Sequence, residues 1–239
     1  MIEYIRKLIM FFFNLVHIYY HQKSIAFYLK NKMNKIDVLF DVGSHMGTYT
    51  DLVLRTNPGC KSFLFEPQSK IFEKIDQKYS HDENVNVFNL AISDAEQKQN
   101  LNLNKHDLTA SLLDFDPKSN YLKFKALLYQ TDINNMNYKT ELVQTITLEK
   151  FIVDNNLEKI DLLKIDTEGF EFDVIKGACN YLKKIKLIYF EHHFDSMIIK
   201  NYKFSEIHEY LKNNNFKKIL KNKMPFRKTF EYIYENRTD

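Results

Sequence analysis

The feature that most constrains this 239-residue chain is a set of four short apolar runs, each of which ends in an acidic residue, a glycine or both. Buried parallel strands are continuous apolar runs, and their carboxyl ends open onto the ligand site of an α/β protein. Four such ends would bring several carboxylates and a glycine turn to one edge of a sheet. The runs are Ile36–Gly47, Phe63–Pro67, Val85–Asp94 and Ile160–Gly169.

Helical segments separate most of these runs, and this alternation predicts a doubly wound parallel sheet. The last two strands are separated by too few residues for a crossover helix, so we expect them to be antiparallel. The expected strands are 36–42, 61–65, 85–92, 142–147, 160–165, 186–190, 216–220 and 229–234, and the expected helices are 46–56, 69–79, 148–155, 170–183 and 204–213.

An N-terminal helical extension, residues 1–35, is expected to precede a main domain of residues 36–239. The apolar stretch Leu8–Tyr20 within it is too short for a membrane-spanning helix. We favour a helix packed on the domain or on a second subunit, because apolar residues nearly encircle it. The other interpretation is an anchor through which residues 1–30 contact a membrane surface. Residues 100–141 lack a clear period, so this irregular insertion is either a lid or binding loop or a flexible surface loop.

Composition narrows the class of protein. The formal charge is +3, with 34 basic and 31 acidic residues, and it gives no basic footprint for nucleic acid. The only two cysteines, Cys60 and Cys179, have no metal-ligand spacing. They predict reduced thiols in a cytoplasmic protein.

The first run contains a sharp turn from strand to helix, Asp41-Val-Gly43-Ser44-His45-Met-Gly47. Gly43 permits a positive φ and a close approach of the backbone to a ligand. The N–H groups at the start of the following helix favour anionic or acceptor groups. The turn lacks the full G-x-G-x-x-G fingerprint, and no Gly-Lys-Ser/Thr follows it, so neither a dinucleotide fingerprint nor a P-loop is present.

Glu66 ends the second strand, about 25 residues after Asp41, where a carboxylate can accept hydrogen bonds from the hydroxyls of a ribose. Because phosphate-binding motifs are absent, the pattern predicts a ribose-bearing cofactor without a pyrophosphate, and Asp41 remains free to face a cationic group. S-adenosylmethionine has the matching ribose, ammonium and sulfonium groups.

These motifs resemble the FkbM family of S-adenosylmethionine-dependent methyltransferases over roughly residues 36–195. The most specific piece is Leu163-Lys-Ile-Asp-Thr-Glu-Gly-Phe-Glu171. The sequence departs from the family at His45, where Asn is usual, and at Glu149, where Asp is usual. The other matching pieces are Asp41–Gly47, Phe65–Pro67, Ala91–Asp94, Thr147–Phe151 and Val174–Gly177.

The resemblance implies an α/β, Rossmann-like class I methyltransferase fold with helices on both faces. Its mostly parallel seven-stranded sheet would have the order 3-2-1-4-5-7-6, with strand seven antiparallel. Asp41 and Gly43 would line the methionine and ribose region, Glu66 would bind the ribose, and Ile92–Ser93 would border the adenine. The cofactor-binding candidates are Asp41, Gly43, Ser44, His45, Gly47, Glu66, Ile92, Ser93 and Asp166.

Catalytic candidates lie at the ends of the fourth and fifth strands. Methyl transfer is an in-line displacement, which a carboxylate or imidazole assists by accepting the proton of a sugar hydroxyl. Acidic residues at a helix N-terminus also serve as caps and complement the helix dipole, and we expect Glu171 to hold the loop. A histidine at the end of the fifth strand can act as a base near neutral pH. The candidates are Asp166, Glu168 and His192.

A divalent metal bound by Asp166 with Glu191, His192 or His193 is a minority interpretation. Adjacent histidines on a strand point to opposite sides, so both cannot easily serve one site. We therefore expect no metal.

The leading hypothesis is a soluble O-methyltransferase that acts on a hydroxyl of a sugar, a glycan or a glycolipid-like metabolite. A non-catalytic nucleotide- or sugar-binding module stays open because of His45 and the insertion. A membrane-peripheral partner protein depends only on the stretch Leu8–Tyr20. An NAD-dependent oxidoreductase is the weakest alternative, since the pyrophosphate fingerprint is missing.

Overall fold

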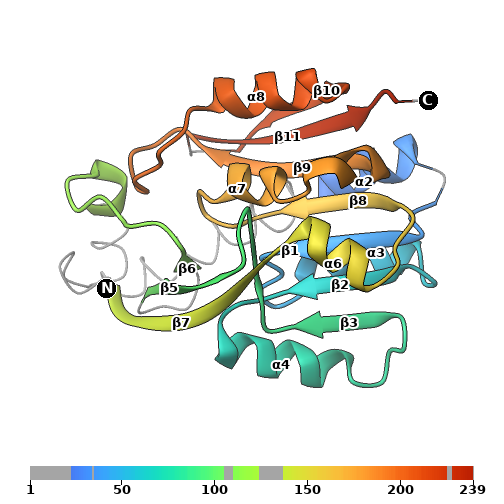
Figure 1. The fold of residues 1–239 in the computed structure, drawn as a ribbon, viewed down its shortest axis with the longest axis horizontal. Helices are drawn as coiled ribbons and strands as arrows, with labels where there is room; N and C mark the ends of the chain where they lie inside the picture. Colours follow the sequence, from blue (N-terminus) through green and yellow to red (C-terminus); the bar gives the residue numbers. More distant parts are fainter. Residues whose placement is uncertain (1–22, 34, 105–109, 124–136, 225–227, 239) are drawn as a thin grey trace, which may run out of the picture.

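A seven-stranded sheet runs through the centre of the structure (Figure 1). The computed structural model describes residues 23–33, 35–104, 110–123, 137–224 and 228–238. The strands of this sheet follow the order β10-β11-β9-β8-β1-β2-β3. They are β1 (Val38–Val42), β2 (Lys61–Phe65), β3 (Val85–Phe88), β8 (Ile160–Ile165), β9 (Ile185–His193), β10 (Phe216–Lys223) and β11 (Thr229–Asn236).

Counted along its own strands, this sheet has the order 3-2-1-4-5-7-6 from β3 to β10. The pairs β1–β2, β2–β3, β1–β8 and β8–β9 are parallel. β11 is antiparallel to both β9 and β10, so the sheet is mixed. The Rossmann-like α/β class expected from the sequence is confirmed.

The expectation of one sheet was wrong, because a second sheet has the order β4-β7-β5-β6. The expected strand 85–92 is split between β3 in the first sheet and β4 in the second. The insertion 100–141, expected to be irregular, contains half of the residue pairs of the antiparallel pair β5–β7. The second sheet consists of β4 (Ala91–Ser93), β5 (Gln97–Asn104), β6 (Ala110–Ser111) and β7 (Asn137–Thr147).

The second sheet forms because one of its faces is apolar. Leu101, Leu103 and Val143 are buried together there. Lys and Asn occupy the positions of β5 that alternate with the leucines, and Gln stands on the leucine face at the start of the strand, so the period of two is hidden in the sequence.

Helices cover both faces of the central sheet, as expected (Figure 1). The main apolar core lies between one face and helices α6, α7 and α8, while α2 and α3 pack on the opposite face. The side chains of β1 alternate between the two faces of the sheet. Phe40 and Val42 belong to the main core, and Leu39 belongs to the core on the opposite face. The helices are α2 (Lys23–Lys32), α3 (Thr48–Thr56), α4 (Ser69–Tyr79), α6 (Leu148–Asp154), α7 (Glu171–Lys176) and α8 (Phe204–Asn213).

The expected helix 170–183 is broken in the structure. α7 ends at Lys176, and a separate 3₁₀ helix spans Cys179–Lys184. Gly177 lies between them, where a Cβ would overlap the carbonyl oxygen of Ser93. The close approach of β4 thus explains the glycine at this position.

The last part of the expected N-terminal extension is α2, which packs on the sheet and α3 through Ile25, Leu29 and Met33. No helix in the described part of the chain is long and apolar enough to cross a membrane. The stretch Leu8–Tyr20, on which the membrane-contact interpretation depends, lies outside the described residues.

Candidate functional site

The turn after β1 lies against the ends of β2 and β8. Gly43 has a φ of +74° and donates its N–H to the carbonyl of Phe65 at 3.0 Å. A Cβ at Gly43 would overlap the carbonyl oxygen of Asp166. Gly47, with a φ of +68°, faces the ring of Tyr79, whose hydroxyl donates to the Gly47 carbonyl at 2.9 Å. Both glycines are required by close contacts as well as by positive φ.

Glu66 directs its carboxylate into this turn and is only 3% exposed. Its Oε2 accepts the N–H of His45 and its Oε1 accepts the N–H of Gln68, both at 2.9 Å. Burial raises the pKa of Glu66 to about 7, and these two hydrogen bonds oppose the rise. The carboxylate is therefore fixed in orientation, and it changes charge near neutral pH.

Ser44 adds an unsatisfied polar group to the turn. Its side chain is 4% exposed, and its hydroxyl oxygen has no hydrogen-bond partner within the described residues. A buried polar atom without a partner is uncommon and is often completed by a ligand or water. The turn thus fits a polar ligand that approaches both Ser44 and Glu66.

Asp41 was expected to face a cationic group of the ligand, and the structure corrects this. The side chain is fully buried, and its Oδ2 accepts the hydroxyl of Thr50 at 2.8 Å. Its Oδ1 lies 3.0 Å from the Nζ of Lys164. A cation from the chain itself therefore already neutralises Asp41.

Lys164 connects three parts of the site, and the sequence analysis gave it no role. Its Nζ pairs with Asp41, donates to the carbonyl of Gly43 at 3.2 Å and lies 3.6 Å from the Oδ2 of Asp166. Burial alone would lower the pKa of Lys164, but the charges of Asp41 and Asp166 raise it. A buried lysine among carboxylates stays protonated and sets their spacing.

Asp166 lies next to the glycine turn, as predicted. Its N–H donates to the carbonyl of Val42 at 2.9 Å, and its side chain is 39% exposed. The structure therefore brings Asp41, Gly43 and Asp166 together, and leaves the carboxylate of Asp166 accessible.

Ile92 and Ser93 lie in the interior. Ile92 is 2% exposed in the main core, and Ser93 is fully buried with its hydroxyl donating to Asp94 at 3.3 Å. Their role beside an adenine stays a prediction.

Asn89 was missed by the sequence analysis. Its Nδ2 donates to the carbonyls of Glu66 and Pro67, each at 3.0 Å, and so joins the ends of β2 and β3. A single asparagine after a strand belongs to no motif, so no sequence signal identified it.

Hydrogen bonds fix the loop between β8 and α7. The Oε1 of Glu171 accepts the N–H of Gly169 and its Oε2 accepts the hydroxyl of Tyr202, both at 2.6 Å. Glu168 has a φ of +49°, and its carbonyl accepts the hydroxyl of Ser111 at 2.8 Å. The loop is therefore tied both to the chain after β9 and to the second sheet.

His192, the predicted base, pairs with Glu171: its Nδ1 lies 3.8 Å from the Oε2 of Glu171, and no ion pair joins it to Asp166 or Glu168 among the described residues. The ring is 3% exposed and lies among the rings of Phe194, Tyr202 and Phe204. Burial lowers the pKa of His192. Its catalytic role stays a prediction without a contact to either carboxylate.

The next residue, His193, faces the other side of β9. It reaches the loop between β8 and α7, residues 166–170, which is the acidic loop of this site. Its Nε2 lies 3.2 Å from the Oε2 of Glu168. The β8–β9 register pairs Lys164 with Tyr189, so Glu191 and His193 share the face of Lys164. This alternation was available in the sequence and would have favoured His193 over His192.

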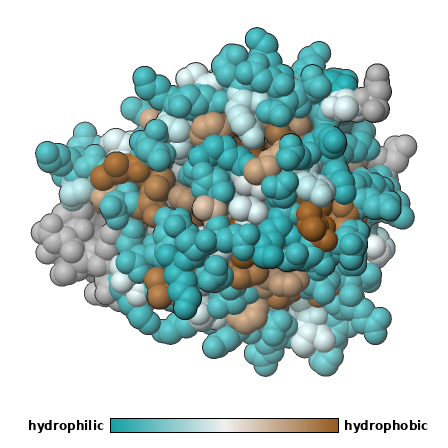
Figure 2. All heavy atoms as spheres, viewed as in Figure 1, coloured by the Kyte–Doolittle hydropathy of each residue, from teal (hydrophilic) through white to brown (hydrophobic). Residues whose placement is uncertain are grey.

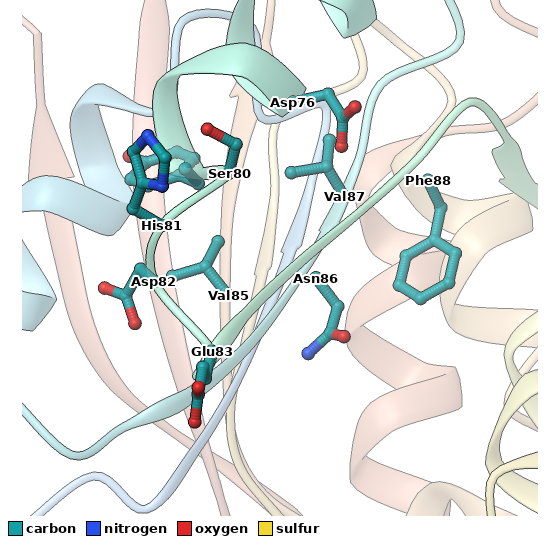
Figure 3. A pocket seen from close by; sticks show the side chains of 10 residues that line it. Asp76, Ser80, His81, Asp82, Glu83, Val85, Asn86, Val87 and Phe88 are labelled. Carbon is teal, nitrogen blue, oxygen red and sulfur yellow. The ribbon is translucent and has the colours of Figure 1, made fainter.

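No group of three or more His, Cys, Asp or Glu side chains within the described residues is arranged to hold a metal ion. A cleft of about 610 Å³ lies elsewhere, beside the end of α4 and β3 (Figure 3). Asp76, His81, Asp82 and Glu83 are among its lining residues, and none of the predicted site residues is. Tyr79, which contacts Gly47, also lines the cleft, so the cleft adjoins the glycine turn without including it.

Known proteins resemble this chain in sequence and in fold. The curated 2-O-methyltransferase NoeI of Sinorhizobium fredii (strain NBRC 101917 / NGR234) is 26% identical over 160 residues, 65% of this chain. This chain spans only 63% of the length of that relative. An uncharacterized protein of Listeria monocytogenes serotype 4b has a similar fold, with a TM-score of 0.50 and 10% identity over 91% of this chain and 67% of that one. The structure of TrmK of M. capricolum, solved with S-adenosylhomocysteine, has a TM-score of 0.48 and 8% sequence identity to this chain. The match covers 86% of this chain and 64% of that one.

The family model described as the methyltransferase FkbM domain matches residues 41–218. The match contains the glycine turn, Glu66, the acidic loop and both histidines of β9. The chain therefore belongs to the methyltransferase FkbM domain family.

Proposed function

We propose that this chain is an S-adenosylmethionine-dependent O-methyltransferase that methylates a hydroxyl of a sugar, a glycan or a glycolipid-like metabolite. The observation that carries the proposal is the carboxylate of Glu66, fixed between the N–H groups of His45 and Gln68 at the end of β2. This is where a dinucleotide-binding fold places the acidic residue that accepts ribose hydroxyls.

The residues of the turn fit the ribose and methionine parts of the cofactor. Glu66 would accept the ribose hydroxyls, and the unsatisfied hydroxyl of Ser44 would bond a polar group beside it. Asp166, with its accessible carboxylate, replaces the buried Asp41 as the group that faces a cationic part of the cofactor. When bound, the cofactor supplies an electrophilic methyl group on a positively charged sulfur.

The acceptor would bind over the ends of β8 and β9, beside the acidic loop. The chain needs to hold the acceptor oxygen in line with the methyl group and to accept its proton. Glu168 would perform the second task, because Asp166 is assigned to the cofactor and His192 is enclosed by aromatic rings. The second sheet contacts this loop through Ser111, which supports a role for the insertion in acceptor binding.

A hydroxyl acceptor is supported by the resemblance to a 2-O-methyltransferase. The test is methyl transfer from labelled S-adenosylmethionine to a panel of monosaccharides and short glycans, each paired with its 2-deoxy counterpart. We expect transfer to at least one sugar, and its loss with the matching 2-deoxy compound if the 2-hydroxyl is the acceptor. Binding of the cofactor without transfer to any sugar in the panel would contradict a sugar acceptor.

A further inference from the structure

Glu168 has a backbone conformation that needs outside support. Its φ of +49° lies in the left-handed region, which is strained for a residue with a Cβ. Such strain persists only where surrounding contacts impose it, and it gathers at functional sites. Here the carbonyl of Glu168 accepts the hydroxyl of Ser111, a residue of β6 in the second sheet. The main chain of Glu168 is thus held by the insertion.

The side chain of Glu168 is held by a different element. Its Oε2 lies 3.2 Å from the Nε2 of His193 at the end of β9. The side chain nevertheless keeps 20% of its surface exposed. The buried Oε2 is therefore paired with His193 by charge, without a hydrogen bond, while the side chain as a whole stays within reach of a ligand.

His193 is itself fixed by polar groups from several elements. Its Nε2 lies 3.3 Å from the Oε1 of Glu191, and its Nδ1 lies 3.1 Å from the hydroxyl of Thr229 and 3.7 Å from the Oδ2 of Asp195. The Nζ of Lys200 donates to the main-chain carbonyl of His193. The imidazole is buried, with a relative exposure of 4%.

These surroundings keep the imidazole protonated at neutral pH. Burial alone would lower the pKa of His193, but Glu168, Asp195, Glu191 and Glu171 raise it to about 9. A positive charge therefore lies 3.2 Å from the carboxylate of Glu168, and the orientation of that side chain depends on His193.

We propose that His193 is a positioning residue that holds the Glu168 carboxylate toward the acceptor hydroxyl, while Ser111 fixes the main chain of Glu168. This inference rests on the proposed function and names the base of that reaction. As the acceptor oxygen attacks, a C–O bond forms and the C–S bond breaks, with its electron pair passing to sulfur. The hydroxyl proton passes to Glu168 and then to water, and His193 keeps its proton throughout.

The same arrangement connects the base to the insertion. Phe115 pairs with Ile198 in an isolated bridge, and Ile198 packs against Gly169, directly after Glu168. Phe115, Leu122, Met197 and Ile198 form one apolar cluster. Figure 2 shows an apolar patch where the segment 110–123 and the loop after β9 meet in Figure 1. The insertion therefore packs directly on the loop that presents the base.

The kinetic test compares His193→Gln with His208→Gln in the full chain. His208 is a partly buried histidine that bonds Tyr234 at 2.9 Å, so it is the matched control. We expect His193→Gln to lower kcat/KM for the acceptor found in the sugar panel by about tenfold or more. The dissociation constant for S-adenosylhomocysteine should change by less than about twofold, because His193 belongs to the acceptor side.

The pH profile separates positioning from a general structural defect. If the protonated imidazole positions Glu168, kcat/KM should fall as the pH passes about 9, where His193 loses its proton, and this basic limb should vanish in His193→Gln. A His193→Gln enzyme with an unchanged profile and unchanged turnover would overturn the proposal.

A second measurement does not depend on an acceptor. NMR titration of the histidine imidazoles should give His193 a pKa near 9 in the wild type, lowered in Glu168→Gln. The same pKa in both proteins would overturn the proposed pair. Absence of S-adenosylhomocysteine binding by the wild type would instead count against the proposed function. The NMR titration would still test the pair of His193 and Glu168, because it needs neither cofactor nor acceptor.

Discussion

The main-chain N–H of His45 donates a hydrogen bond of 2.9 Å to the Oε2 of Glu66, and so joins the glycine turn to the end of β2. The bond orients a carboxylate that is 3% exposed and whose pKa burial raises from 4.5 to about 7. Cofactor binding at this site should therefore depend on pH near neutrality.

The affinity for S-adenosylhomocysteine should increase by about tenfold from pH 6 to pH 8, because only ionised Glu66 accepts hydrogen bonds from both ribose hydroxyls. Calorimetric titration at pH 6, 7 and 8 measures this. In Glu66→Gln the affinity should be weaker and independent of pH over this range. A wild-type affinity that is flat from pH 6 to pH 8 would contradict the assignment of this carboxylate.

Gly43→Ala should destabilise the protein by about 2 kcal/mol or more, because the residue needs a positive φ and its Cβ would overlap the carbonyl of Asp166. Urea unfolding gives the free energy of unfolding. Gly59→Ala is the control, since nothing lies within 4 Å of a Cβ there. Equal losses in the two variants would mean that the turn tolerates a side chain.

Much of the central sheet could be predicted from the sequence because its strands are continuous apolar runs. β2, α4, β8 and α8 have the expected bounds. β9 extends beyond the expected Phe190 to His193, because polar residues at the end of the strand masked its continuation. The second sheet was missed for a related reason, since β5 alternates leucine with asparagine inside a polar stretch.

The candidate site was predictable where a motif marks a turn and less so where partners come from distant strands. Gly43, Glu66 and Asp166 were singled out, and the structure places them around one turn. The sequence analysis treated Lys164 only as part of a motif. Its burial and its ion pair with Asp41 become visible only in the folded structure, where β1 and β8 lie side by side. His193 was passed over because strand alternation was applied to the metal hypothesis and not to the choice of base.

Lys164→Met should lower the free energy of unfolding by about 3 kcal/mol, because it leaves the fully buried Asp41 without its counter-ion. Thermal and urea unfolding both measure the change. Lys159→Met is the control: its side chain is 61% exposed, and its ion pair with Asp37 is screened by solvent, so its loss should change the stability little. Similar effects of the two substitutions would show that the pair under the glycine turn is not structurally important.

The stability of the wild type should fall as the pH rises toward 9. The pKa of His193 is raised from 6.5 to about 9 by the carboxylates around it, so its contribution is complete below pH 6.5 and is lost as the pH passes 9. Urea unfolding at pH 6, 7, 8 and 9.5 tests this, with His193→Gln expected to show a smaller decrease. A variant whose stability falls as steeply as that of the wild type would exclude His193 as the titrating group.

The most direct test is calorimetric titration of S-adenosylhomocysteine into the wild type, Glu66→Ala and Glu73→Ala at pH 8. Glu73 lies on the exposed side of α4 and serves as the matched control. We predict that the wild type and Glu73→Ala bind one equivalent with equal affinity, and that Glu66→Ala binds at least about tenfold more weakly. Absence of binding by the wild type, or the same affinity in all three proteins, would contradict the account.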